Sequence, residues 1–282
     1  MPKKGFTLVE VLVVAPIIIL SIGAFIAVVV SLTGNVLVSR SASMLQYDIQ
    51  DAADRIEADI RMSPQFLSST SNIPFTASNP QGYTNTPNTP SSGTTTLFTN
   101  IDKTSTGGST ASLILRTYLT DKNPVRAQGD VSLLHLPTPT ACTGNYRTNQ
   151  PAYGDIVYFI SDNALWRRTI LPANYATANY CGGVPYQQPS CSPGTTHAFC
   201  KVVDSRLIGG VDSVNFSVAY YTNEDATSAN STAVSASSSD AAREAILSGM
   251  KSALVSITAE KEVAGRTIER SVSLRTSRLN NL

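Results

Sequence analysis

Apolar residues dominate the N-terminal part of the chain, and the run from Val11 to Thr33 contains no charged side chain. A helix needs about 20 predominantly apolar residues to cross the hydrocarbon core of a bilayer. The run is long enough for this, so the pattern predicts a membrane-spanning helix. Pro16, Gly23 and Gly34 are helix breakers, and we expect the helix to kink or weaken at these positions.

The pattern becomes amphipathic beyond this run. Apolar residues recur at spacings of three and four, which is typical of one face of a helix; they are Leu45, Ile49, Ala52 or Ala53, Ile56 and Ile60. The other face is charged, and we expect its side chains to be solvated; they are Asp48, Asp51, Asp54, Arg55, Glu57, Asp59 and Arg61. Asp51 with Arg55, and Glu57 with Arg61, have the i,i+4 spacing of helical ion pairs.

The helix is expected to end before Pro64, because the residue that precedes a proline avoids the α region. One helix then runs from near Phe6 to Ser63. Residues 6–33 form its membrane-spanning part, and residues 34–63 form an amphipathic stalk whose apolar face needs a partner sheet.

Strand signals fill the rest of the chain, residues 64–282. Ser112 to Tyr118 is apolar and β-prone, and Val214 to Tyr220 alternates between apolar and polar residues. Two hairpins are predicted, from Asp155 to Ile170 across Asp162-Asn163 and from Val255 to Leu274 across Ala264-Gly265. These strands predict one antiparallel sheet with a buried face that the stalk covers, so the fold class is α+β with a β-rich head.

Two segments of the head are rich in Ser, Thr, Asn, Pro and Gly. They are residues 68–112 and residues 222–240. Such a composition cannot bury a core, so we predict flexible surface loops there. A short helix is expected around Ala241 to Leu247.

Charges indicate the orientation of the apolar run. Lys3 and Lys4 precede it, and the first charged residue after it is Arg40. Basic residues next to a span favour the cytoplasmic side. We therefore expect a cytoplasmic N-terminus, with the stalk and the head outside. The whole chain of 282 residues has a net charge of +1, so no basic surface indicates direct binding of nucleic acid.

A single acidic residue, Glu10, lies at the start of the apolar run. A carboxylate at the edge of hydrocarbon costs on the order of 2 to 3 kcal/mol and normally marks function. Ordinary secretory signals are cleaved after their apolar core, whereas the site-like step here, Gly5-Phe6, precedes it. Cleavage at this step leaves the apolar segment on the mature protein. A plain signal anchor is the alternative, but it leaves Glu10 unexplained.

The N-terminal motif resembles the class III leader of type IV prepilins and pseudopilins; its residues are Gly5, Phe6, Thr7, Leu8, Val9 and Glu10. Within that superfamily the chain resembles the larger minor pilins and J-type pseudopilins of the PilW-like group. The hairpin from Val157 to Arg167 and the closing strand from Ser271 to Thr276 carry this second resemblance. It implies the type IV pilin fold.

The resemblance implies that residues 1–5 are a leader, removed after Gly5 by prepilin peptidase, and that the new amino group of Phe6 is methylated. It also implies that Glu10 pairs with the Phe6 amine of a neighbouring subunit and sets the axial register. The expected partners are other pilin subunits, prepilin peptidase, the inner-membrane assembly platform and the membrane. The subunit is expected in the bacterial cytoplasmic membrane before assembly and in a cell-surface pilus afterwards.

Four cysteines fall in the predicted exported part, namely Cys142, Cys181, Cys191 and Cys200. An even number outside the cytoplasm favours disulfides. Of the three possible connectivities, Cys142–Cys181 with Cys191–Cys200 is preferred because it closes two separate loops. Free thiols, or a metal site that adds His197, are the alternatives, but the close C-x-x-C spacing of zinc sites is absent. We expect no metal site.

Catalytic chemistry has little support in the sequence. The motifs G-x-S-x-G, H-E-x-x-H and the P-loop are absent, and His135 lies in an apolar context that favours a core or edge position. We expect no enzymatic activity and no cofactor. Tyr175 to Tyr186 is either a recognition surface or a disulfide-tied loop.

Three functions fit these observations. The first is a minor pilin of a type IV pilus, located at the tip or in the priming complex. The second is a pseudopilin of a type II secretion or DNA-uptake system. The third is a pilus-borne adhesin that uses the polar loops or the tyrosine segment.

Overall fold

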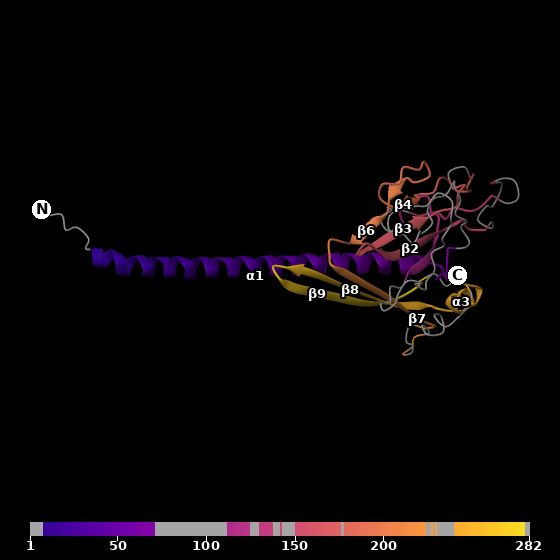
Figure 1. Cartoon of the computed structure of the whole chain (residues 1–282). Helices are drawn as coiled ribbons and strands as arrows, with labels where there is room; N and C mark the ends of the chain where they lie inside the picture. The colour runs from indigo at the N-terminus through magenta and orange to yellow at the C-terminus, as the bar shows by residue number, and fades with distance from the viewer. Residues whose placement is uncertain are drawn as a thin grey trace.

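A computed structural model describes residues 8–70, 112–124, 130–137, 142, 150–175, 178–223, 227, 229 and 240–279. A long helix, α1, extends from a head that surrounds only its C-terminal half (Figure 1). The chain thus has the predicted α+β arrangement, in which an apolar N-terminal helix packs on antiparallel sheets.

Helix α1 runs from Leu8 to Met62, which confirms one continuous helix up to Pro64. The Ser63 backbone N–H donates to the Ile60 carbonyl at 3.1 Å and closes the last turn. The helix continues without a break through Pro16, Gly23 and Gly34. None of these residues ends the helix, and Pro16 removes only one backbone donor from the ladder.

The first antiparallel sheet has the strand order β1-β2-β3-β6. Its strands are β1 (Leu113–Tyr118), β2 (Tyr153–Ser161), β3 (Ala164–Ile170) and β6 (Ser205–Ile208). Asp162 and Asn163 connect β2 to β3 with φ angles of 50° and 53°, as a two-residue type I′ turn requires. The predicted hairpin is confirmed.

The second antiparallel sheet has the order β7-β8-β9. Its strands are β7 (Ser213–Tyr221), β8 (Ser252–Val263) and β9 (Arg266–Ser277), and helix α3 (Asp240–Ser248) precedes β8. Val255 lies opposite Leu274, and Ile257 lies opposite Val272, so the second predicted hairpin is confirmed. A short parallel pair, β4 (Ser190–Cys191) with β5 (Val202–Val203), completes the described strands.

The strands form two main sheets rather than the single sheet predicted, and α1 lies between them (Figure 1). The main core joins the apolar stripe of α1 to both sheets; it includes Ile49, Ile56, Ile60, Tyr158, Leu165, Phe216, Val255 and Ile257. The alternation of apolar and polar residues marks which strand face is buried, but not which strands pair. The sequence pattern therefore could not reveal the division.

The two predicted loops are described only in part. Ser68, Ser69 and Thr70 are buried, so the first predicted loop does not begin at residue 68. Thr222 and Asn223 are exposed, and α3 begins at Asp240, close to the predicted helix. Residues 71–111 and most of 224–239 lie outside the described part of the chain.

Candidate functional site

The exposed apolar half of α1 is the main candidate site. The most apolar window of 18 residues in the helix has a mean hydropathy of 2.9 and none of it is buried. The large side chains exposed there include Leu12, Ile17, Ile19, Leu20, Ile22, Phe25, Ile26, Val30 and Leu32. This part of α1 is long and apolar enough to span a membrane.

The head begins to cover α1 just beyond this segment. Arg266, at the tip of the β8–β9 hairpin, donates from Nη1 to the Asn35 Oδ1 atom at 3.1 Å. Val38 and Ala42 are partly buried against the core, and Leu45 is buried. The head therefore covers α1 from about Asn35 onward.

Two hydroxyl groups of the exposed half are satisfied within the helix. The Ser21 hydroxyl donates to the Ile17 carbonyl at 2.8 Å, and the Thr33 hydroxyl donates to the Val29 carbonyl at 2.8 Å. A Cβ atom added at Gly23 would meet nothing within 4 Å. These two hydroxyls are thus paired within the helix, and Gly23 is a small residue where another helix could approach closely.

The structure describes little of the residues predicted for cleavage and assembly. Lys3, Lys4, Gly5 and Phe6 lie outside the described residues. Glu10 belongs to the first turns of α1, but its side chain is likewise outside the description. The roles assigned to these residues remain predictions.

A buried ion pair fastens the stalk to the first sheet. The Asp59 side chain is only 4% exposed and accepts hydrogen bonds at Oδ2 from Tyr158 Oη, at 2.5 Å, and from Arg167 Nε, at 2.6 Å. Burial and the neighbouring Asp59 carboxylate raise the pKa of Tyr158. Burial is the largest single influence on Arg167 and lowers its pKa, but Asp59 and Tyr158 together outweigh it and raise the pKa overall.

Asp59 therefore does not face solvent, and the prediction for this residue was wrong. It lies three residues after Ile56 and is next to Ile60, so its position in the helical period is on the apolar face. That spacing was the signal that sequence reasoning missed. The predicted Glu57–Arg61 pair is present, whereas Arg55 lies 4.0 Å from Asp59.

A second acidic residue, Asp155 of β2, is buried where the charges of Arg116 on β1 and Glu244 on α3 act on it. Glu244 of α3 accepts from Gln65 Nε2 at 2.6 Å and from the Ser68 N–H at 2.8 Å, and Arg116 donates to Gln65 at 3.2 Å. Burial raises the pKa of Asp155 to about 7; the positive charge of Arg116 opposes this shift, and the negative charge of Glu244 adds to it. The Asp155 Oδ2 atom is buried without a hydrogen-bond partner.

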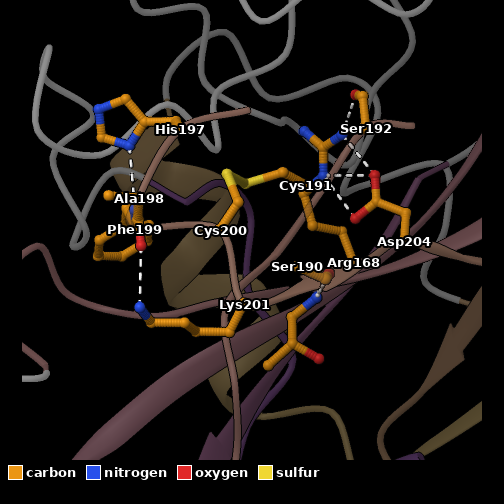
Figure 2. Close-up of a disulfide and its surroundings, with 11 residues drawn as sticks. Arg168, Ser190, Cys191, Ser192, His197, Ala198, Phe199, Cys200, Lys201 and Asp204 are labelled. Atoms are coloured by element: carbon orange, nitrogen blue, oxygen red, sulfur yellow. Dashed lines mark hydrogen bonds and ion pairs between the residues drawn. A yellow bond between two sulfur atoms is a disulfide. The ribbon is translucent and has the colours of Figure 1, made fainter. Parts of the chain in front are cut away.

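Two disulfides join Cys142 to Cys181 and Cys191 to Cys200, which is the connectivity preferred from the sequence. Figure 2 shows the Cys191–Cys200 disulfide beside a buried ion pair between Arg168 and Asp204. Arg168 donates from Nη2 to the Asp204 Oδ2 atom and to the Ser192 hydroxyl, each at 2.6 Å. This ion pair fixes the disulfide loop to β3.

The metal-site alternative does not fit this geometry. Cys181 belongs to one disulfide, while Cys191 and Cys200 form the other. His197 accepts a hydrogen bond at Nδ1 from the Phe199 N–H at 3.1 Å (Figure 2). Across the described ranges, no three His, Cys, Asp or Glu side chains gather where they could hold a metal ion.

The remaining candidates have structural roles. His135 is buried, and its backbone pairs with that of Cys181, which confirms the predicted core or edge position. Tyr175 and Tyr180 are buried in a small apolar cluster with Phe199. Of the tyrosines from Tyr175 to Tyr186, only Tyr186 is exposed.

Comparisons with known proteins give no family assignment. No protein-family model, no curated protein and no solved structure matches the chain. The long apolar helix followed by antiparallel sheets is compatible with a pilin-like fold. The described arrangement can anchor a folded head to an apolar environment through one long helix.

Proposed function

We propose that this chain is a minor pilin, a subunit of a type IV filament that enters the filament through its N-terminal helix. The observation that carries the proposal is the exposed apolar half of α1, which continues without a break into a stalk held by both sheets. An apolar helix that its own head leaves uncovered must be covered by lipid or by other helices. The leader motif supports this proposal, because a subunit cleaved there could exchange the surrounding lipid for the helices of other subunits.

In this proposal prepilin peptidase cuts after Gly5, and the new amino group of Phe6 is methylated. Glu10 then pairs with the Phe6 amine of a neighbouring subunit, because a carboxylate surrounded by apolar helices is stable only beside a positive charge. The inner-membrane platform moves the subunit out of the bilayer. Its place is at the tip or in the priming complex, where the size of the head does not obstruct the packing of a long shaft.

The experiment that tests the proposal is mass spectrometry of sheared surface filaments beside the membrane fraction of the producing bacterium. We expect an N-methylated peptide that begins at Phe6, present in filaments at low abundance. The same mature end found only in membranes would favour a pseudopilin of a secretion or DNA-uptake system. An uncleaved Met1 end in both fractions would overturn the proposal.

Replacing Glu10 with glutamine should leave membrane insertion and cleavage intact while lowering incorporation into filaments by at least about tenfold, since the loss of one buried ion-pair partner exceeds 1.4 kcal/mol. Quantitative immunoblots of sheared filaments and membranes measure the ratio. Asp48→Asn, an exposed acid on the stalk, is the matched control. Equal incorporation of both variants would count against the role of Glu10.

A further inference from the structure

Gln65, three residues beyond the end of α1, links charged side chains from the two sheets. Its Oε1 atom accepts from Arg116 Nη1 on β1 at 3.2 Å, and its Nε2 atom donates to Glu244 Oε1 on α3 at 2.6 Å. The Ser68 backbone N–H donates to the second carboxylate oxygen of Glu244 at 2.8 Å. Because α3 precedes β8, these hydrogen bonds join the second sheet to the first.

The segment around Gln65 and helix α3 are each held to the head by other contacts as well. Arg116 donates its backbone N–H to the Gln65 carbonyl at 3.0 Å, and Leu67 donates its N–H to a carbonyl of β1 at 2.9 Å. On the other side, Leu247 of α3 is fully buried in the main core. The hydrogen bonds to Glu244 can therefore open while both partners remain attached to the head.

Asp155 of β2 lies beside this chain of hydrogen bonds. It is directly opposite Arg116 in the β1–β2 pair, so the two side chains are on the same face of the sheet. Asp155 is only 1% exposed, and its Oδ2 atom has no hydrogen-bond partner in the part of the chain that the structure describes. Arg116 thus donates to the neutral Gln65 amide although a carboxyl group lies opposite it. This is the arrangement expected for a protonated Asp155, because an ionised carboxylate is the stronger acceptor.

Other ionisable groups share this face of the sheet. On β3, Arg168 is paired with Asp204 at 2.6 Å. On β1 and β2, the rings of Tyr118 and Tyr153 lie opposite each other with centroids 5.1 Å apart, and burial raises the pKa of Tyr118 above its ordinary value of 10.0. An arginine is charged and a tyrosine is neutral near pH 7, so Asp155 is the group among these whose charge changes.

We propose that Asp155, Arg116, Gln65 and Glu244 form a pH-dependent latch between the two sheets, closed while Asp155 is protonated and opened when Asp155 ionises. A neutral Asp155 leaves Arg116 bonded to Gln65, and Gln65 and Ser68 hold the Glu244 carboxylate. Loss of the proton to solvent creates a carboxylate that attracts Arg116 across the strand pair and repels Glu244. The hydrogen bonds from Gln65 and Ser68 to Glu244 then break.

The direction of the response follows from the raised pKa of Asp155. Burial raises this pKa to about 7, the charge of Arg116 opposes the shift, and the charge of Glu244 adds to it. The folded head therefore holds the proton up to about pH 7, and the latch opens as the pH rises through this value. The latch lies wholly in the head, so it does not depend on filament assembly.

Amide hydrogen exchange of the full-length protein in detergent tests the latch. Mass spectrometry with peptide fragmentation follows the Ser68 amide, which is bonded to Glu244, and the amides of Val255–Ala259 in β8, the central strand of its sheet. Each protection factor is taken against the unstructured chain at the same pH. At about pH 5.5 the Ser68 amide should be at least about tenfold less protected than the β8 amides, because the latch opens without unfolding of the head.

The protection of the Ser68 amide should then fall by at least about another tenfold between about pH 5.5 and about pH 8.5. Because opening releases one proton, the fall should approach tenfold per pH unit up to about pH 7 and level off above it. This profile is measured on the wild-type chain, so it tests the latch even if a variant fails to fold. A protection factor that does not change with pH would overturn the proposal.

Three variants identify the groups responsible. Asp155→Asn cannot ionise, so it should keep the protection of the Ser68 amide within about threefold across the same pH range. Glu244→Ala removes the acceptor, so at about pH 5.5 its Ser68 amide should exchange at least as fast, relative to the unstructured chain, as that of the wild type at about pH 8.5. Asp48→Asn, which changes an exposed acid, should follow the wild-type profile.

Two other results would overturn the latch. Equal protection of Ser68 and of the β8 amides would mean that this junction opens only when the whole head unfolds. A wild-type fall with pH that persists in Asp155→Asn would assign the response to a different group. Thermal unfolding at about pH 5.5 checks that each variant is folded before its exchange is compared.

Discussion

Replacing Asp59 with alanine is expected to lower the free energy of unfolding by about 3 to 5 kcal/mol, because it leaves the Arg167 guanidinium buried without its carboxylate. The Tyr158 hydroxyl loses its acceptor in the same variant. Denaturant unfolding of the full-length protein in detergent measures the effect. The single tryptophan of the chain, Trp166, adjoins Arg167, so its fluorescence reports directly on this junction.

Two variants separate the buried charge from a general loss of helix stability. Asp51→Ala removes an exposed acid from the same helix and should change stability by less than about 0.5 kcal/mol. The double variant Asp59→Leu with Arg167→Met removes both charges and should recover most of the loss. If Asp59→Ala and Asp51→Ala had the same small effect, the junction would not depend on this ion pair.

The second large effect is a dependence of the free energy of unfolding on pH. The pKa of Asp155 is about 7 in the folded chain, against an ordinary value of 3.8. Between about pH 4 and pH 7, the folded state therefore holds a proton on Asp155 that the unfolded state has already released. The contribution of this residue to stability is fully present below pH 4 and is lost as the pH rises to about 7. A shift of about three pKa units corresponds to a loss on the order of 4 kcal/mol.

Asp155→Asn removes the titrating group and should flatten this part of the pH profile. We expect the variant to be close to the wild type in stability near pH 4 and more stable near pH 8. Denaturant unfolding at several pH values measures the difference between the two profiles. Asp48→Asn should follow the wild-type profile throughout, because its side chain is exposed. If Asp155→Asn had the same stability profile against pH as the wild type, Asp155 would be ionised in the folded protein without a loss of stability.

The elements that depend on local pattern could be predicted from the sequence. Alternating residues from Val214 to Tyr220 specify a half-buried strand, and Asp162-Asn163 can adopt the left-handed conformation that a tight hairpin needs. Pro64 specifies where α1 ends. The disulfide connectivity was preferred because each pair closes a separate loop, and the structure has this connectivity.

Features that depend on contacts between distant elements could not be predicted in the same way. A second sheet covers a wider arc of α1 than one sheet can, and residues at the margin of its apolar stripe become buried. The ion pairs of Asp59 with Arg167 and of Asp204 with Arg168 join positions far apart in the chain. The raised pKa of Asp155 likewise follows from its burial in the folded head, to which the charge of Glu244 on α3 adds.

The hydrogen bond between Arg266 and Asn35 determines how the head would meet a lipid surface. Asn35 follows Thr33 by two residues, which corresponds to about 3 Å along a helix axis. With α1 in a bilayer up to Thr33, the turn at Ala264-Gly265 would lie at the level of the phosphate groups. The β8–β9 hairpin would then act as a collar that stops the helix from sinking further, and the guanidinium of Arg266 would lie where anionic lipids concentrate.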